Sequence, residues 1–284
     1  MTEYACLRRR EAGFPALLAA IHDPPARLHL RGSSDPGPLQ EPTVAIVGAR
    51  ACSAYGRSVA RSLARELAAA GLVVVSGMAR GIDGEAHRGA LEAGGRTVAV
   101  LGCGIDRDYP AAHAELARRI REHGLVVSEY ETGVEPAPWR FPARNRIIAG
   151  LCRATVVVEA RERSGALITA DFALEEGREV LAVPGEITSA LSAGTNALLR
   201  LGATPVTCAA DVLELYDLAP APRSAPSLGP AAETLLARLR DSALTADELV
   251  RVSGLGPGES AAALTALELA GQVRVEDGVY RAAV

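Results

Sequence analysis

The chain has 284 residues, of which 49% are hydrophobic and 23% are charged, and its formal net charge is −4. These values are typical of one α/β domain with a sizeable core plus a small accessory domain, and no apolar run approaches the ~20 residues of a membrane span. All 30 basic residues are arginines, which excludes a Schiff-base lysine and the lysine of a triphosphatase phosphate loop.

The cysteines and histidines are scattered without the paired spacing of a zinc site or a disulfide framework. We therefore expect reduced thiols, no metal and no cofactor. The arginines of residues 8–10 are not followed by an apolar signal-peptide segment, so a cytoplasmic location is the default expectation. Because the net charge is negative, nucleic-acid binding would require a local patch of arginines.

Residues 1–40 contain turn material such as Asp23-Pro24-Pro25 and little periodicity, which predicts a short amino-terminal extension. From Thr43 onward, apolar runs alternate with helical patterns. The apolar runs cover 44–47, 73–75, 97–101, 125–127, 155–159 and 180–183, and the helical patterns cover 53–70, 84–93, 112–123, 166–177 and 195–201. Continuous Val/Ile runs between helices predict a Rossmann-like, doubly wound, mainly parallel sheet over residues 41–218.

Residues 219–230 are rich in Pro and Ala and predict a linker. Helical patterns at 231–240, 245–252 and 260–271, followed by a hairpin pattern at 273–281, predict a winged helix over 231–284. This segment holds five arginines against eight acids, and its presumed recognition helix, 259–270, has no basic residue. A protein-contact or regulatory role is therefore favoured over reading of a DNA groove.

Small and polar residues follow the predicted strands, at the edge where doubly wound sheets bind ligands. In the loop that begins at Gly48, Arg50 stands where a dinucleotide-binding loop has its second glycine. Together with Ser53 near a helix start, Arg50 is suited to a phosphodiester or another anion. Arg80, after Gly77, is a second candidate phosphate ligand. A surface arginine beside a tight turn is the alternative in both loops.

A further loop, 161–169, places Ser164 and Gly165 at a predicted helix start and Thr169 one turn inside it. Their backbone N–H groups could hold an anion. Ordinary helix capping explains the same residues.

The segment from Trp139 to Gly150 concentrates three arginines, two aromatic residues and Asn145 just before an apolar helix start. Such a cluster suits a nucleic-acid strand, whose phosphates recur and whose bases stack on aromatic or guanidinium faces. A solvated arginine loop with Trp139 and Phe141 in the core is the alternative. No catalytic set emerges, since no Gly-x-Ser-x-Gly elbow is present and no carboxylate pair has a spacing that demands acid–base chemistry.

Five motifs follow one another along the chain: Val-Ala-Ile-Val-Gly-Ala-Arg, Ser-Gly-Met-Ala-Arg-Gly-Ile-Asp, Phe-Pro-Ala-Arg-Asn-Arg-Ile-Ile-Ala-Gly, Ser-Gly-Ala-Leu-Ile-Thr and Val-Pro-Gly. In sequence and in order they closely resemble those of the DNA-processing protein A family (DprA/Smf), and the resemblance runs over residues 26–216. The resemblance implies a Rossmann-like domain that binds single-stranded DNA in natural transformation without enzymatic activity. It also implies protection of incoming DNA, loading of a RecA-type recombinase and a homodimer formed through the Rossmann-like domain.

Carried over by position, the resemblance implies that Arg50 and the segment from Arg144 through Asn145 to Arg146 line the DNA pocket. Phe141 would support the pocket or stack within it. The residues expected to shape its floor are Gly48, Ser53, Gly77, Arg80, Ser164, Gly165 and Thr169.

The chain departs from the family pattern in three ways. Many members carry an amino-terminal helical domain where this chain has about 40 residues, so that domain is either lost or the chain starts late. Ala49 replaces the small hydroxyl residue usual beside the motif arginine. A lysine often found in the pocket has no counterpart, so another arginine must substitute or affinity falls.

Two other functions remain open from the sequence. Related Rossmann-like enzymes that cleave the N-glycosidic bond of nucleoside monophosphates use a Pro-Gly-Gly-x-Gly-Thr loop, of which Pro184-Gly185-Glu186 is an echo. A regulatory adaptor acting through its winged helix is the other alternative, and it would leave the arginine cluster unexplained.

Overall fold

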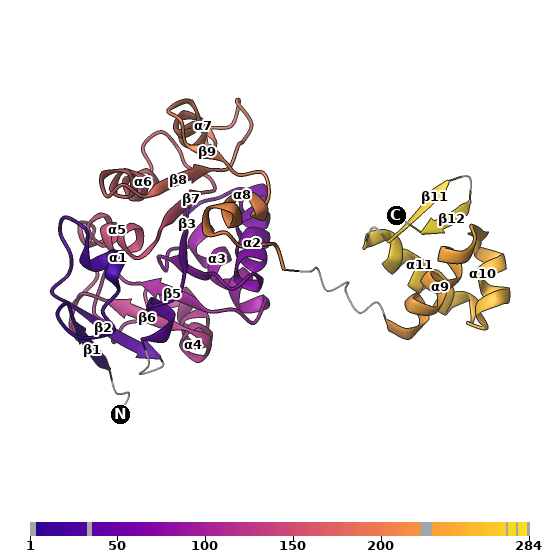
Figure 1. Ribbon diagram of the computed structural model, residues 1–284, viewed down its shortest axis with the longest axis horizontal. Coiled ribbons are helices and arrows are strands. Elements are labelled where there is room, and N and C mark those ends of the chain that lie inside the picture. Colours follow the sequence, from indigo (N-terminus) through magenta and orange to yellow (C-terminus); the bar gives the residue numbers. More distant parts are fainter. Residues whose placement is uncertain (1–3, 33–35, 222–228, 271, 277, 283–284) are drawn as a thin grey trace. The chain divides into compact units, whose positions relative to one another are not determined.

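The computed structural model describes residues 4–32, 36–221, 229–270, 272–276 and 278–282. The chain divides into two compact units, residues 1–221 and residues 222–284 (Figure 1). Residues 222–228 of the expected linker lie outside the described residues, and each unit is described by itself. Within the described part of the chain, no helix is long and apolar enough to cross a membrane.

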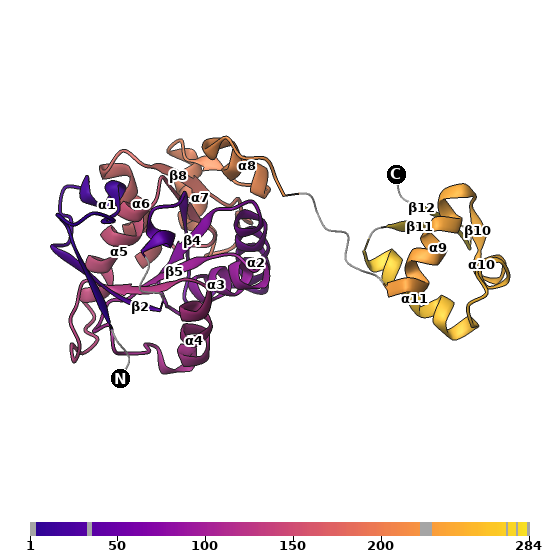
Figure 2. The same cartoon turned by 60° about the horizontal axis from the view of Figure 1, so that its bottom comes forward.

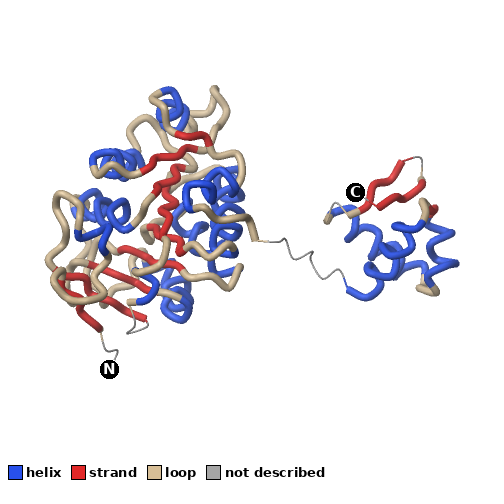
Figure 3. Tube along the Cα trace, viewed as in Figure 1, coloured by secondary structure: helices blue, strands red, loops and turns tan. Residues whose placement is uncertain are grey.

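Among the described residues, the first unit forms one nine-stranded sheet (Figure 3). The strand order is β1-β2-β6-β5-β4-β3-β7-β8-β9; β3 to β9 pair in parallel with one another, and β1 and β2 are antiparallel to their neighbours. The strands are β1 Ala5–Arg8, β2 Arg27–Gly32, β3 Thr43–Val47, β4 Val73–Ser76, β5 Thr97–Val100, β6 Leu125–Ser128, β7 Ala154–Val157, β8 Glu179–Ala182 and β9 Thr204–Pro205. The predicted mainly parallel α/β class is confirmed.

Helices cover both faces of this sheet (Figure 2). They are α1 Ala16–Ala19, α2 Ala54–Ala69, α3 Ile82–Glu92, α4 Ala114–His123, α5 Arg140–Leu151, α6 Gly165–Glu175, α7 Ala193–Arg200 and α8 Ala209–Leu213, with 3-10 turns at Gly37–Leu39, Ala111–His113 and Glu214–Tyr216. Along β3, Ala45 and Val47 pack with α1, α5 and α6, whereas Val44 and Ile46 pack with α2, α3 and α8. Both sets of side chains are buried because successive residues of a strand point to opposite faces, which explains the unbroken apolar runs.

The amino-terminal residues differ from their expected description as turn material. The β1 strand pairs with β2, and β2 pairs with β6 at the edge of the sheet. The buried leucines Leu28 and Leu30 alternate with the polar residues Arg27, His29 and Arg31, so β2 has the period-two sequence pattern of a strand. The turn residues on both sides of β2, and a β6 partner about 100 residues away, hid that pattern in the sequence. Helix α1 adds Leu18 to the same core.

The second unit has helices packed against a small antiparallel sheet, as the winged-helix prediction requires. The elements are α9 Gly229–Asp241, β10 Leu244–Thr245, α10 Ala246–Ser253, α11 Pro257–Leu269, β11 Val273–Glu276 and β12 Val279–Ala282. The sheet order is β10-β12-β11, so the predicted hairpin gains a short third strand. Leu235, Leu249 and Leu267 are fully buried in its core. Gly271 and Asp277, which ended the predicted helix and lay in the predicted turn, fall outside the described residues.

Candidate nucleic-acid interface

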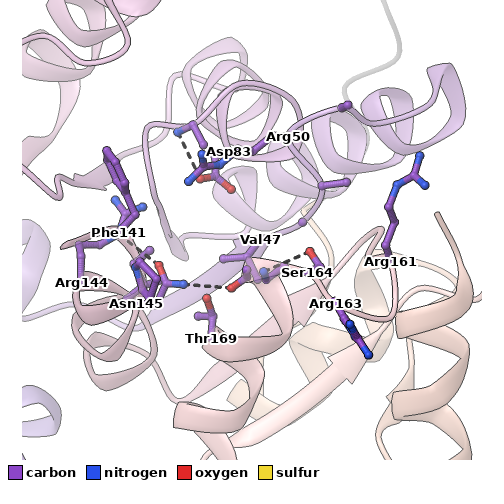
Figure 4. A pocket seen from close by; sticks show the side chains of 18 of the residues that line it. Val47, Arg50, Asp83, Phe141, Arg144, Asn145, Arg161, Arg163, Ser164 and Thr169 are labelled. Carbon is purple, nitrogen blue, oxygen red and sulfur yellow. Dashed lines mark hydrogen bonds between the residues drawn. The ribbon is translucent and has the colours of Figure 1, made fainter. Parts of the chain in front are cut away.

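A cavity of about 310 Å³ lies at the carboxyl ends of the central strands (Figure 4). The chain continues from β3 to β4, β5 and β6 on one side of β3, and β7 and β8 lie on the other side. At such a switch point the loops that follow the central strands diverge and leave a crevice. The predicted site residues that line it are Gly48, Arg50, Phe141, Arg144, Asn145, Ser164, Gly165 and Thr169.

A second cavity of about 380 Å³ adjoins the first, since both are lined by Arg50, Phe141 and Arg144. Arg80 and Tyr109 line only the second cavity. The loops after β3, β4 and β5 therefore extend the site along the edge of the sheet. An elongated site with shared walls is suited to a polymer rather than to one small molecule.

The ring of Phe141 lies at the junction of the two cavities. The Arg50 guanidinium carbon is 5.4 Å from the centre of this ring, and the Tyr109 ring stacks on it with a centre-to-centre distance of 5.4 Å and an interplanar angle of 23°. Tyr109 is 43% exposed. Delocalised faces of this kind attract the faces of unpaired bases.

The arginines of the segment 139–150 do not precede a helix, as the sequence pattern indicated, but lie within α5 itself. Side chains two positions apart on a helix point in directions about 200° apart, so Arg144 and Arg146 face opposite sides of α5. This geometry gives them different surroundings, and neither resembles a solvated loop arginine.

Arg144 is buried beneath the cavities and is only 5% exposed. Its Nη1 donates to the carbonyl of Val100, and its Nε donates to the side-chain oxygen of Asn145 over 3.3 Å. Burial lowers the pKa of its guanidinium to about 10, against the opposing effect of the Asp83 carboxylate. Arg144 therefore braces the floor of the site from below, with little of its guanidinium left for a ligand.

Asp83, in the first turn of α3, lies beside Arg144 and accepts a hydrogen bond from the backbone N–H of Ala79 over 3.3 Å. Burial raises the pKa of Asp83 to about 6, although Arg144 acts in the opposite direction. Gly77 lies against this pair, because a Cβ there would approach Asp83 Oδ2 to 2.4 Å and Arg144 Nη2 to 2.6 Å. Gly77 thus makes room for the buried pair and does not itself line either cavity.

Arg146 points away from the cavities toward the amino-terminal segment. Its Nη2 lies 2.8 Å from Glu129 Oε2, and its Nε lies 2.9 Å from Asp23 Oδ2. The Arg146 side chain is 14% exposed and that of Glu129 is 17% exposed. With two carboxylates around it, Arg146 joins α5 to the residues before β2 and after β6, and it lines neither cavity.

Ser53 also differs from its expected role. Its hydroxyl and its backbone N–H both donate to the carboxylate of Glu159, and its hydroxyl oxygen accepts from Gly56 N–H over 3.0 Å. Glu159 is 4% exposed at the end of β7. The anion position at the amino terminus of α2 is therefore occupied by the protein's own carboxylate.

The amino terminus of α6 borders the first cavity. The hydroxyl of Ser164 caps the helix by accepting from Ala166 N–H over 3.3 Å. The amide of Asn145 donates to the Gly165 carbonyl over 3.0 Å, which ties α5 to this loop. Thr169 is buried one turn inside, with 1% exposure. The capping interpretation is confirmed, and the capping residues also line the cavity, where binding of an anion stays a prediction.

Comparison with known proteins identifies the family of the chain. Residues 5–217 match the model of DNA recombination-mediator protein A, and residues 219–278 match the DprA winged helix domain. The chain belongs to this family. It is 46% identical over 246 residues to a putative DNA processing protein DprA from Mycobacterium tuberculosis, covering 84% of this chain and 63% of that protein's length. It is 47% identical over 208 residues to DNA processing protein DprA from Streptococcus pneumoniae, covering 72% of this chain and 71% of the relative.

Two solved structures of family members are similar to the chain. The X-ray structure of DprA from Streptococcus pneumoniae has a TM-score of 0.72 and 45% identity, and it covers 75% of this chain and 74% of the other. A structure that addresses the single-stranded DNA binding mode of DNA processing protein A from Helicobacter pylori has a TM-score of 0.67 and 31% identity, and it covers 76% of this chain and 98% of the other.

Two arginines that sequence reasoning did not select line the first cavity of this family member. Arg161 and Arg163 precede the α6 cap and lie across the cavity from Phe141 and Arg144 (Figure 4). Both arginines could have been predicted from the sequence, because they follow a buried strand and stand beside Ser164, which was a predicted site residue. Four exposed arginines border the combined site, and within the described residues none of them has a carboxylate within 4.0 Å: Arg50, Arg80, Arg161 and Arg163.

Proposed function

We propose that the protein binds single-stranded DNA along the two adjoining cavities and holds it without cleaving it. The observation that carries this proposal is the set of four exposed arginines that line the two cavities and have no carboxylate within 4.0 Å among the described residues, together with the stacked ring of Phe141 at the junction. Arginine offers a planar fork of donors that matches phosphate oxygens. A row of such groups beside a stacking surface is how proteins hold an unpaired strand without reading its sequence.

The roles of the predicted residues follow from their surroundings. Arg50 and Arg80 hold phosphates over the second cavity, and Arg161 and Arg163 hold phosphates at the far rim of the first. Phe141 supports a base, with Tyr109 behind it. Arg144 supplies positive charge from below and fixes the shape of the floor. Arg146 and Ser53 maintain the fold rather than contact DNA, because their polar groups already have protein partners.

Single strands are favoured over duplexes for a steric reason. A base can lie against Phe141 or Tyr109 only if its face is free, and the bases of a duplex are stacked on one another. Because phosphates and base faces recur in every DNA sequence, we also expect the protein to bind single strands with little sequence preference.

The wider role rests on the family. Its members are described as DNA processing proteins and as recombination mediators, and one relative is described by its single-stranded DNA binding mode. The proposed role is therefore protection of incoming DNA in the cytoplasm and loading of a RecA-type recombinase onto it in natural transformation. The proposed assembly is a homodimer formed through the first unit. The acidic winged helix is assigned a protein-contact or regulatory role.

Cleavage of N-glycosidic bonds has no specific observation in its favour. Glu186, the carboxylate of the Pro-Gly-Glu echo, is exposed and lines neither cavity. The acid that does line the first cavity is Asp83, which is engaged by Ala79 N–H and lies beside Arg144.

The test is fluorescence anisotropy with labelled single-stranded and double-stranded oligonucleotides at two salt concentrations. We expect tighter binding of the single strand, steeply weakened by salt. Arg50→Ala should weaken single-strand binding by at least tenfold, which corresponds to about 1.4 kcal/mol. The matched control is Arg118→Ala on α4, where the arginine is exposed but paired with Glu115 and Glu122. Equal binding of single and double strands, or an Arg50 variant that binds like the control, contradicts the proposal.

A further inference from the structure

A second group of delocalised side chains lies at the amino terminus of α5, outside the linings of both cavities. The guanidinium carbon of Arg140 is 4.8 Å from the centre of the Trp139 ring and 5.1 Å from the centre of the Tyr130 ring. Trp139 is 63% exposed. Most of a large aromatic side chain is thus presented to solvent, with its neighbouring guanidinium held against it.

Arg140 is fixed in place from the backbone side. Its Nη1 donates to the carbonyl of Glu135, and its backbone N–H donates to the carbonyl of Ala137 over 3.0 Å. Its Nε is buried and has no hydrogen-bond partner among the residues that the structure describes. The side chain that supports Trp139 is therefore ordered before any ligand arrives, which reduces the entropy cost of binding.

The charges around this group favour an anionic ligand. The segment between β6 and α5 carries three acids, and each is paired with an arginine from elsewhere in the unit. The pairs are Glu129 with Arg146 over 2.8 Å, Glu131 with Arg27 over 2.7 Å, and Glu135 with Arg107 over 2.6 Å. Arg140 has no carboxylate within 4.0 Å in the described part of the chain, so its positive charge is not neutralised by an ion pair.

The position of Trp139 relative to the cavities is set by the helix. Phe141 lines both cavities and is only two residues away. Side chains two positions apart at a helix start point in nearly opposite directions, so Phe141 faces inward while Trp139 faces outward. The indole lies at the amino-terminal end of α5, so it meets a strand that leaves the cavities past Phe141 and turns around this end of the helix.

We propose that Trp139, supported by Arg140 and Tyr130, is a second base-stacking position for single-stranded DNA, at a nucleotide outside the cavities. This inference rests on the proposed function. An indole offers a large flat face to any base, and Arg140 beside it can approach the adjoining phosphate. The Trp139 ring itself contributes stacking energy. It therefore adds affinity only for strands long enough to extend beyond the cavities, and this added affinity depends little on salt.

The first test uses the fact that Trp139 is the single tryptophan of the chain. Unlabelled oligothymidylate is titrated into the full-length protein while tryptophan emission is recorded, and anisotropy of a labelled oligonucleotide measures binding in parallel. We expect emission to be quenched with the same midpoint as binding. Trp139→Phe should abolish the tryptophan signal while keeping affinity within about twofold, since a phenyl ring still stacks.

The second test compares affinities. Trp139→Ala should weaken binding of a long oligothymidylate about fivefold and leave a short one, which fills only the cavities, unchanged. The salt dependence of Trp139→Ala should match that of the wild type, because no phosphate contact is lost. The control is Leu174→Ala on α6, which removes a side chain that is 57% exposed. Thermal unfolding checks that each variant is folded.

The outcomes separate this inference from the proposed function. Binding of the single strand without quenching, or quenching with an unchanged affinity of Trp139→Ala for the long strand, overturns the inference and leaves the function intact. Failure of the wild type to bind any single strand overturns the proposed function itself.

Discussion

Helix α5 and the loops at the carboxyl ends of the strands both carry arginines, but the two regions keep them in different states. Arg144 is buried beneath the site, and Arg146 is paired with two carboxylates. The loop residues Arg50 and Arg163 are exposed and line the cavities. The arginines Arg144 and Arg146 of α5 are therefore mainly a scaffold, while arginines from several separate loops form the available positive surface. Pairing and burial, rather than local density, decide which charges a ligand can reach.

The largest effect that tests this contrast is expected at Arg144. Arg144→Ala leaves the Asp83 carboxylate buried without its neighbouring cation and removes the hydrogen bond to Val100. We expect the free energy of unfolding to fall by about 3 kcal/mol. Single-strand binding should weaken as well, because the floor of both cavities loses its brace. Urea denaturation measures the first change, and a stability like that of the wild type would show that Arg144 is not structural.

Asp83 makes the stability of the folded protein depend on pH. Its pKa is raised from 3.8 to about 6 in the folded protein, so the folded state binds this proton more tightly than the unfolded state does. The contribution of Asp83 to stability is therefore lost as the pH rises from about 4 to 6, by about 3 kcal/mol. Asp83→Asn does not titrate, so its stability relative to the wild type should rise across this window and then level off. A constant difference between pH 4 and pH 7 would contradict the assignment.

A smaller effect is expected at Arg146. Arg146→Ala removes two ion pairs at a partly exposed site, so the free energy of unfolding should fall by about 1 kcal/mol. Single-strand affinity should stay within twofold of the wild type. A large loss of affinity in a folded Arg146 variant would mean that Arg146 itself contacts DNA, contrary to its assignment as a residue that maintains the fold.

The sheet could be predicted from the sequence because each of its central strands is recognisable from a short run of consecutive residues. Runs such as Val73–Ser76 and Thr97–Val100 are continuous and apolar, and helical patterns separate them. Strands β1 and β2 escaped prediction because they lie among turn residues and because β2 joins the sheet through β6, about 100 residues along the chain. A prediction from local pattern has no access to such a partner.

The site was predicted in outline for the same reason. The loops that follow parallel strands meet at one edge, and there Arg50 lines both cavities, Ser164 the first and Arg80 the second. The sequence could not predict which polar groups remain available to a ligand, because their hydrogen-bond and ion-pair partners lie far away along the chain. Glu159 holds Ser53 from 106 residues away, and Asp23 holds Arg146 from 123 residues away. These contacts exist only after folding.

The salt dependence of single-strand affinity tests the central claim most directly. The double variant Arg161→Ala/Arg163→Ala is compared with Arg146→Ala and the wild type, as the slope of log K against log salt concentration. Two lost phosphate contacts should reduce the magnitude of the slope by about 1.4 in the double variant, whereas Arg146→Ala should keep the wild-type slope. The opposite result, a reduced slope in Arg146→Ala and an unchanged slope in the double variant, would contradict the account.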